Sequence, residues 1–523
     1  MSQSPLKDLE PESWDGEEDF VEADIRPEYS PIRVGVALMT LVASVVGVGW
    51  WVKDRVVPSA AADSFSAGSW FAPYVDTTLT PMYQFQDPNA NVARQTVLGF
   101  VVAGQGCQPT WGGSYSLSQA DSSLNLSSRI AQYRGVGGDA IISFGGRDHL
   151  DLARACTTVP SLTRAYQQVV SRYHPSLLDF DVEGAALTDK SSLVRRAAAV
   201  AALVRNNGGS RHLGVWVTVP AGPGGLSNSA LDVARTMLAD KVVPAGINVM
   251  AMDFGQPETS MARTVDAVAT AAEAQVVQLF QQFGVTSNLA SRFGVTVMIG
   301  ENDTPGENLS VAGATQVAAT ASRDHWGRLS IWSLNRDSQC GSAFAEVGVL
   351  STSCSGAAES PLAYSHLFSS TLTGRDGVGA PASTGVALAP SSAPGPYPQW
   401  SPAVPYPPTY KVVRNGEIYQ AKWFTQGQDP ATVVQYPSQT PWQLIGPVLA
   451  GSHPPTTTTL PSGTYPTWSP HTTYVQGQRV LFAGLPYQAK WYNQAQSPAA
   501  AATDPTGSPW QALFTWPGEP PLG

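Results

Sequence analysis

Three carboxylates occupy every second position in the segment from Ser176 to Gly184, which reads Ser-Leu-Leu-Asp-Phe-Asp-Val-Glu-Gly. Alternate side chains of a β-strand point to the same face, so Asp179, Asp181 and Glu183 would lie together and the apolar residues between them opposite. Carboxylates gathered out of water repel one another and share protons. At least one of them then has a raised pKa and can act as an acid near neutral pH.

Two other readings of this segment are open. An exposed edge strand would leave the acids in water, but strands of parallel sheets are covered on both faces. A Mg²⁺ or Ca²⁺ site would draw most of its six to eight oxygens from one strand, which is an awkward geometry. We therefore favour acid catalysis by Glu183, the last of the three before Gly184, and expect no metal and no cofactor.

The elements that position these acids follow from the pattern between residues 68 and 374, where short β-rich runs alternate with helix-period segments. Eight such units in about 300 residues indicate an α/β fold, a (β/α)₈ TIM barrel. An open doubly wound sheet is the alternative, but no Gly-rich dinucleotide turn follows the first strand. The expected strands are Phe71–Asp76, Thr96–Ala103, Ala140–Phe144, Leu177–Glu183, Leu213–Pro220, Ile247–Phe254, Gly294–Ile299 and Leu329–Asn335. The expected helices include Leu162–Tyr173, Ser191–Asn206, Ser260–Phe283 and Ser310–His325.

In such a barrel the chemistry lies at the carboxyl ends of the strands. Polar or aromatic residues stand at that end of nearly every expected strand, which a purely structural barrel would not require. Besides the three acids they are Asp76, Gln105, Ser143, Trp216, Thr218, Asp253, Gln256, Glu301, Asn302, Asp303, Trp332 and Asn335, and Gly145 and Gly146 follow Ser143. Trp111 lies in a loop after the second strand, where it would line a subsite or pack beside Cys107.

The acidic segment resembles the Asp-x-x-Asp-x-Asp-x-Glu signature of family 18 glycoside hydrolases, the chitinases and their relatives. Ser143-Phe-Gly-Gly is similar to the family's Ser-x-Gly-Gly on strand three, and Trp332 to the strand-eight tryptophan beneath the −1 sugar. The resemblance implies that Glu183 protonates the glycosidic oxygen, Asp181 orients the substrate's acetamide and Asp179 modulates Asp181. The substrate is then its own nucleophile, with retained anomeric configuration, and needs an N-acetyl group.

Two positions depart from the family pattern. Ser176 stands where the signature has its first Asp, and Met250-Ala-Met-Asp253 stands where many members have Met-x-Tyr-Asp. Asp253 transfers as a substrate-binding residue, but the tyrosine that bonds the acetamide does not. Gln256 is our candidate for the missing donor.

The C-terminal part contains a duplication. After a Gly-, Ala-, Pro- and Ser-rich linker at 375–396, residues 397–446 and 465–516 share aromatic and proline positions displaced by 68, separated by a linker at 447–464. Both units resemble family 5/12 chitin-binding modules, which are small all-β domains. The resemblance implies that Trp423 with Phe424, and Trp491 with Tyr492, stack on sugar rings. Whether the remaining tryptophans are core or binding residues stays open for Trp400, Trp442, Trp468 and Trp510.

The N-terminus suggests a membrane anchor. Residues 34–52 contain no charge and are nearly long enough to span the ~30 Å hydrocarbon layer as a helix. They would follow a disordered cytoplasmic tail at 1–33 and precede a linker at 53–67. We expect a single-pass protein of the cell membrane with its catalytic region outside; the alternative is secretion after cleavage near Ala60-Ala-Ala.

Net charge and cysteine content limit the possible partners and the compartment of the protein. A net charge of −10 without a basic stripe excludes nucleic acid as a partner. Four cysteines allow two disulfides in an exported chain, Cys340 with Cys354 and Cys107 with Cys156, against the alternative of four free thiols. The leading hypothesis is a monomeric, endo-acting chitinase with an open groove. The alternatives are an endo-β-N-acetylglucosaminidase acting on glycans and a non-catalytic chitin-binding adhesion protein.

Overall fold

The computed structural model describes residues 68–209, 213–341, 350–375, 388–389, 395–434, 437–452, 462–503 and 507–513. The predicted tail 1–33, membrane span 34–52 and linker 53–67 lie outside these residues. Within the described ranges, no helix combines the length and the hydrophobicity needed to cross a bilayer.

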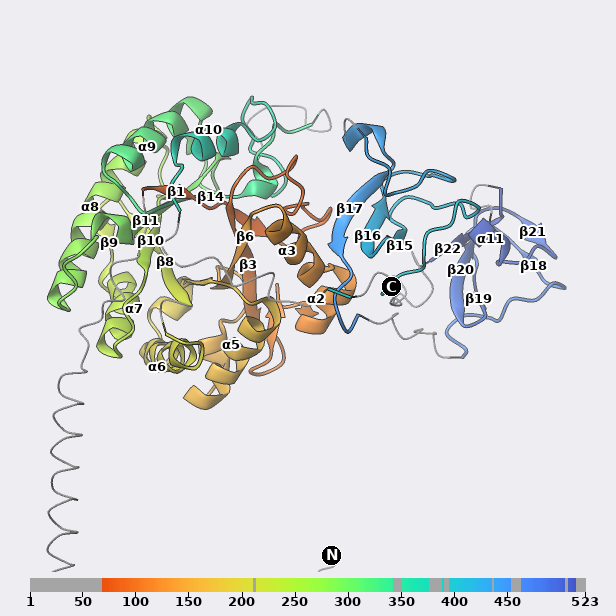
Figure 1. Ribbon diagram of the computed structural model, residues 1–523, viewed down its shortest axis with the longest axis horizontal. Helices are drawn as coiled ribbons and strands as arrows, with labels where there is room; N and C mark the ends of the chain where they lie inside the picture. The colour runs from red at the N-terminus through yellow and green to blue at the C-terminus, as the bar shows by residue number, and fades with distance from the viewer. Residues whose placement is uncertain are drawn as a thin grey trace, which may run out of the picture. The chain divides into compact units, whose positions relative to one another are not determined.

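Parallel strands close into a barrel, as the sequence predicts (Figure 1). The first barrel strand is interrupted at Ala72 and Pro73, so that its halves close the ring: β1 (Trp70–Phe71) pairs with β14 (Arg328–Trp332), and β2 (Tyr74–Asp76) pairs with β3 (Gln95–Ala103). The strands between β3 and β14 are β6 (Asp139–Gly145), β7 (Leu177–Asp181), β8 (Gly214–Gly222), β10 (Gly246–Met250) and β11 (Phe293–Met298). Each of the eight expected strands matches one of these positions, with shifted ends. The short strands β4 (Pro109–Trp111), β5 (Tyr115–Ser116) and β9 (Gly225–Leu226) extend the sheet in antiparallel fashion.

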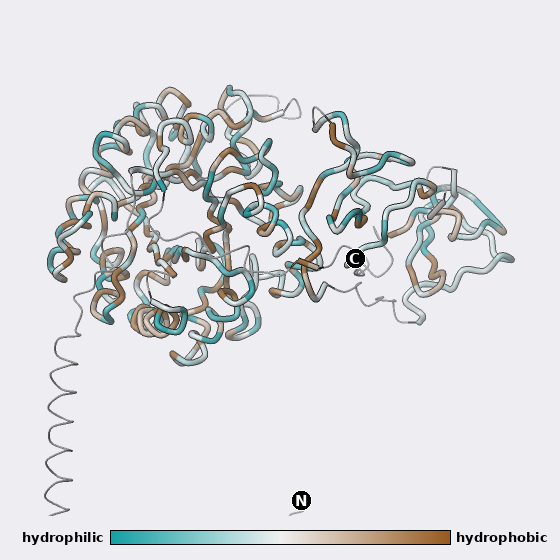
Figure 2. Tube along the Cα trace, viewed as in Figure 1, coloured by the Kyte–Doolittle hydropathy of each residue, from teal (hydrophilic) through white to brown (hydrophobic). Residues whose placement is uncertain are grey.

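Helices surround the strands (Figure 1). They are α2 (Leu117–Ser123), α3 (Leu126–Gly135), α4 (Leu152–Ala155), α5 (Val159–Tyr173), α6 (Lys190–Asn206), α7 (Asn228–Ala239), α8 (Met261–Gln282), α9 (Val311–Arg323) and α10 (Ala363–Thr371). Helix α5 shows why they form: Thr158 caps its first turn reciprocally with Ser161, and Leu162, Tyr166 and Val169 bury one stripe. Along these helices the trace changes back and forth between hydrophobic and hydrophilic (Figure 2). In α8, for example, the apolar residues Val265, Ala269 and Val276 are buried.

Two of the tryptophans considered as site residues belong to the core. Trp111 is fully buried and donates its Nε1 hydrogen to the Tyr173 hydroxyl at 3.0 Å. Trp216 is also buried and meets Trp70 edge to face, with ring centroids 5.6 Å apart. Of the two readings for Trp111, packing is therefore the one that the structure supports.

Both predicted disulfides are confirmed. Cys107 is bonded to Cys156, and Cys340 to Cys354. The first tethers the loop after β3 to the end of α4, and the second closes a local loop after β14. No described cysteine is left as a free thiol.

The C-terminal duplication is visible as two three-stranded antiparallel sheets. Strands β15 (Lys411–Arg414), β16 (Glu417–Ala421) and β17 (Trp442–Pro447) form one, and β19 (Arg479–Phe482), β20 (Leu485–Ala489) and β22 (Trp510–Ala512) form the other. The second repeat adds a β18 (Thr473–Tyr474) and β21 (Asn493–Gln494) pair and the single turn α11 (Ala500–Thr503). Equivalent strands begin 68 residues apart.

The four tryptophans whose role the sequence leaves undecided show the same environments in both repeats: one is buried and one is half-buried. Trp442 and Trp510 are buried, and their Nε1 hydrogens go to the Gln428 carbonyl at 2.8 Å and the Gln496 carbonyl at 2.7 Å. Trp400 and Trp468 pack half-buried against the same small cores. All four are thus packing residues, and the aromatic pairs that follow β16 and β20 are not.

Candidate active site

The three acids lie at the carboxyl end of β7. Asp179 and Asp181 point inward from the strand and are 0% and 3% exposed. The strand ends at Asp181 rather than at the predicted Glu183, which directly precedes the short 3₁₀ helix Gly184–Leu187, makes no capping hydrogen bond with its side chain and is half-buried. Glu183 therefore stands above the other two at the mouth of the barrel, where a substrate can reach it.

Four donors converge on the Asp179 carboxylate. The Tyr74 and Ser143 hydroxyls donate to its Oδ2 at 2.9 and 2.7 Å. The Thr218 hydroxyl and the Arg328 guanidinium donate to its Oδ1 at 2.7 and 2.8 Å. Each carboxylate oxygen thus accepts two hydrogen bonds, and one of the four comes from the charged guanidinium of Arg328.

Arg328, the counter-ion of Asp179, is a site residue that the sequence did not reveal. Its side chain is 0% exposed and also donates to Ser330 Oγ at 2.8 Å. The guanidinium carbon lies 5.3 Å from the Tyr74 ring centre and 5.6 Å from that of Trp216. The expected strand began at Leu329, so Arg328 was left outside it. The structure places this buried cation beside Asp179.

Asp181 is the most perturbed of the three acids. Burial raises its pKa well above the usual range, and the neighbouring charges of Glu183 and Asp179 raise it further. Its Oδ1 is buried and has no hydrogen-bond partner among the described residues. A protonated or partly protonated carboxyl with one oxygen unpaired is suited to bonding a polar group of a substrate.

Glu183 has the titration of a general acid. Burial raises its pKa to about 7; Arg147 opposes the rise, and the carboxylates of Asp148 and Asp253 add to it. A carboxyl with this pKa is suited to giving up a proton near neutral pH, and the role of Glu183 as the acid stays a prediction.

The glycine pair after β6 is required by the close approach of two strand ends. Gly145 has φ of +104°, and a Cβ there would come 1.9 Å from the Asp181 carbonyl oxygen. Gly146 donates its backbone hydrogen to that oxygen at 3.0 Å, and a Cβ on it would press on the Phe100 ring at 3.0 Å. Any larger residue at Gly145 would displace the acid-bearing strand.

Aromatic rings form one wall beside the acids. Trp332, at the end of β14, is half-buried, and its ring centroid lies 5.6 Å from that of Phe100 and 6.2 Å from that of Tyr74. Since Tyr74 also donates to Asp179, the wall is joined to the acids. The sequence analysis missed Phe100 because it lies inside a long apolar strand. Nothing in such a sequence distinguishes an aromatic residue that lines the site from one that packs in the core.

Asp253 follows β10 with φ of +50° and accepts a hydrogen bond from the Thr304 backbone at 3.2 Å. Burial raises its pKa, and the charge of Asp303 raises it further. Asp303 itself pairs with Arg147 at 3.0 Å. Gln256 is exposed on the same loop, and its role as an acetamide donor stays a prediction.

The other polar residues at the strand ends support the loops rather than the acids. Asn302 donates to the carbonyls of Met298 and Gly300 at 3.1 and 3.0 Å. Asn335 exchanges two hydrogen bonds with the Asp76 backbone, at 2.9 and 3.0 Å. Within the described part of the chain, no group of three or more His, Cys, Asp or Glu side chains is arranged to hold a metal ion.

The aromatic pairs of the repeats are exposed. Trp423 and Phe424 are 44% and 46% exposed, and Trp491 and Tyr492 are 44% and 66% exposed. The ammonium groups of Lys422 and Lys490 lie 4.8 and 4.5 Å from the centres of the adjacent tryptophan rings. Flat rings left in solvent on such small domains are suited to stacking on sugars.

The comparison with known families identifies the second repeat. Residues 467–511 match carbohydrate-binding module family 5/12. The first repeat shows the same sheet at the same offset, as described above.

About half of the chain is similar to known chitinases. It is 32% identical over 280 residues to the "Probable bifunctional chitinase/lysozyme" of Escherichia coli K12, and 31% identical over 278 residues to "Endochitinase 11" of Metarhizium anisopliae. Each alignment covers 51% of this chain, but only 31% and 52% of the respective relative. The catalytic domain of a chitinase from Pyrococcus furiosus superposes with a TM-score of 0.51 and 25% identity, covering 58% of this chain and 95% of that domain.

Proposed function

We propose that this chain is a family 18 chitinase that hydrolyses internal β-1,4 bonds of N-acetylglucosamine polymers, with two chitin-binding modules. The observation that carries the proposal is Glu183, a carboxyl with a pKa of about 7 just beyond the strand end that holds Asp181 and the Arg328-paired Asp179. Similarity to chitinases and the match of residues 467–511 to a carbohydrate-binding family support the substrate class.

In the proposed first step Glu183 gives its proton to the glycosidic oxygen as the bond to C1 breaks. The carbonyl oxygen of the substrate's own acetamide forms the new bond to C1, and Asp181 holds the acetamide nitrogen and the positive charge that develops on it. The new bond closes a second ring on the sugar. Water then attacks C1 and opens that ring while Glu183 takes a proton from the water, so the anomeric configuration is retained. Asp179, fixed by its four donors, acts on Asp181 through its charge, which raises the pKa of Asp181.

The substrate requirement gives the test of the proposal. Release of short N-acetylglucosamine oligosaccharides from colloidal chitin, measured by chromatography, is the expected result. Fully deacetylated chitosan and cellulose, which lack the acetamide, should release nothing. Cleavage of deacetylated chitosan at a comparable rate would contradict a mechanism in which the substrate supplies the nucleophile.

The activity should depend on pH through Glu183. Its raised pKa of about 7 keeps the carboxyl protonated below that pH, so kcat/KM is expected to fall about tenfold per pH unit above it. Arg147 lowers this pKa, so Arg147→Ala should move the falling limb to higher pH. Initial rates on a soluble chitin oligosaccharide between pH 4 and 9 measure the falling limb of the unaltered chain and of the variant. If the limb lies at the same pH in both, the assignment of this limb to Glu183 is contradicted.

The exposed aromatic pairs should determine binding to insoluble chitin. Replacing Trp491 and Tyr492 by Ala is expected to weaken adsorption to chitin roughly tenfold or more, because stacked rings dominate such contacts. Depletion of the protein from solution by chitin beads measures this. Hydrolysis of a soluble oligosaccharide serves as the control and should not change, since the pair lies outside the barrel.

We also propose export of the barrel and modules, with residues 34–52 as the anchor. Two disulfides agree with an oxidising compartment.

A further inference from the structure

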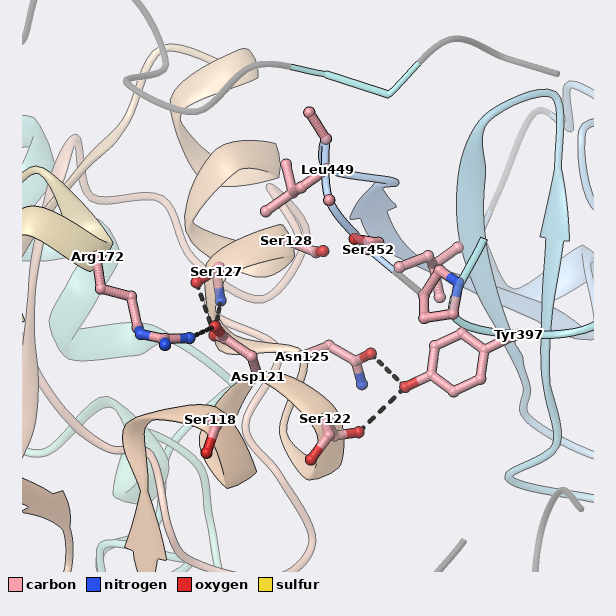
Figure 3. A pocket seen from close by; sticks show the side chains of 14 residues that line it. Ser118, Asp121, Ser122, Asn125, Ser127, Ser128, Arg172, Tyr397, Leu449 and Ser452 are labelled. Atoms are coloured by element: carbon pink, nitrogen blue, oxygen red, sulfur yellow. Dashed lines mark hydrogen bonds and ion pairs between the residues drawn. The ribbon is translucent and has the colours of Figure 1, made fainter. Parts of the chain in front are cut away.

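The first repeat is seated on the barrel through specific polar contacts. The Tyr397 hydroxyl donates to Asn125 Oδ1, in the turn between α2 and α3, at 2.5 Å and to the carbonyl of Ser122, in the last turn of α2, at 3.3 Å (Figure 3). The Lys411 ammonium reaches the Ser123 carbonyl at 3.4 Å. Tyr397 and Lys411 are 6% and 5% exposed, so these contacts are largely out of water.

A second set of contacts comes from the loop between β2 and β3. Gln86 is buried, and its amide reaches the Leu444 carbonyl of β17 at 3.5 Å. The Arg129 guanidinium of α3 holds the other end of the Gln86 amide at 2.9 Å and lies over the Phe85 ring. The barrel thus offers β17 a hydrogen-bond donor, the Gln86 amide, whose orientation is fixed by Arg129 of the barrel itself.

Gly446 shows how closely the two surfaces meet. A Cβ at this position of β17 would stand 2.2 Å from the Ser128 carbonyl oxygen of α3, so no side chain fits there. The corresponding residue of the second repeat, 68 positions later, is Phe514. A phenylalanine at position 446 would force β17 away from α3, so the residue type at this offset in the second repeat is a poor match for the same surface.

The two repeats also differ in what covers the sheet face around Lys411. The equivalent of Lys411 is Arg479, which is exposed and bonds the hydroxyl of Tyr465 at 3.0 Å. Tyr465 is itself the equivalent of Tyr397. In the first repeat both positions contact the barrel, and the Lys411 ammonium also lies 5.4 Å from the Tyr397 ring centre. In the second repeat the equivalent pair is bonded within the module.

We propose that the first repeat is a built-in part of the catalytic unit, held on a barrel surface made by the α2–α3 turn, α3 and Gln86 that recognises it and excludes the second. Its aromatic pair, Trp423 and Phe424, remains exposed in this seat. The first repeat then holds a bound polymer at a set orientation to the barrel, whereas the second serves as a separate tether. The two modules of the duplication have different tasks.

Calorimetric unfolding of the full chain tests this proposal. We expect the barrel and the first repeat to unfold in one shared transition, and the second repeat in another. Gly446→Phe should split the first repeat from the shared transition. Tyr397→Phe, which removes only the hydroxyl, should lower the shared transition by about 3 °C, because it leaves a buried oxygen of Asn125 unpaired.

The matched control is Tyr465→Phe, which removes the equivalent hydroxyl from the second repeat and should leave the shared transition unchanged. If Tyr397→Phe behaves like Tyr465→Phe, and the first repeat of the unaltered chain already melts separately from the barrel, the proposal is overturned. Because Tyr397→Phe preserves the ring that packs in the module core, its result does not depend on whether Gly446→Phe folds.

Discussion

Replacing Glu183 by Gln should lower kcat/KM on chitin oligosaccharides by roughly two to four orders of magnitude. The amide has the shape of the protonated acid but cannot give up a proton, so cleavage of the glycosidic bond loses its donor. Adsorption to insoluble chitin should persist, since the exposed aromatic pairs of both repeats are untouched. This combination separates a hydrolase from a chitin-binding protein with an idle barrel.

The matched control for this variant is Glu301→Gln, at the same rim of the barrel. Glu301 lies in β12 (Gly300–Glu301) and accepts a hydrogen bond from Asn308 of β13 (Asn308–Leu309), away from the three acids. It should retain most of the activity. Equal turnover by Glu183→Gln and the unaltered chain would reject Glu183 as the acid.

Glu183→Gln should also change how stability depends on pH. The pKa of Glu183 is raised in the folded chain to about 7 from 4.5, so the native state is favoured while this group is protonated and loses stability as the pH rises from about 4.5 to about 7. The uncharged amide avoids that loss. At pH 8 the variant is expected to be more stable by up to about 3 kcal/mol, and at pH 4 equally stable. Thermal unfolding at the two pH values measures the difference.

Arg328→Met is expected to have the largest effect on stability. It leaves Asp179 buried at 0% exposure with no counter-ion, and breaking a buried ion pair from one side costs about 3–5 kcal/mol. Urea unfolding of the variant and of the unaltered chain measures this loss.

The double variant Arg328→Met with Asp179→Asn provides the control for this prediction. It removes both charges, so it should recover much of the lost stability, because neutral replacement of a buried pair is far less costly than leaving one charge alone. Activity should not return, since Asp181 would then lack the negative neighbour that the proposed mechanism uses. If the double variant is less stable than Arg328→Met, the ion pair is not what Arg328 contributes.

The sequence predicts the barrel because its signals are local. Strands buried on both faces read as continuous apolar runs, and the three acids of β7 stand out against them. The repeats are equally legible, since an offset of 68 recurs in sequence and in strand positions.

The charge network around Asp179 could not be predicted in the same way. Its four donors come from β2, β6, β8 and β14, and only the closed ring of strands brings Tyr74 and Arg328 to one carboxylate. Arg328 also lies one residue before the expected strand, where a charge reads as a loop residue. The seat of the first repeat depends on a contact between Gly446 and Ser128, which are more than 300 residues apart, and no periodicity records it.

The anomeric form of the first products tests the central claim most directly. Proton NMR during early hydrolysis of an N-acetylglucosamine oligosaccharide distinguishes the two forms before they interconvert. Attack by the substrate's own acetamide, with Glu183 as acid and then base, predicts that the new reducing end appears as the β-anomer. Initial appearance of the α-anomer would mean that water attacks C1 directly, and would contradict the roles assigned here to Asp181 and Glu183.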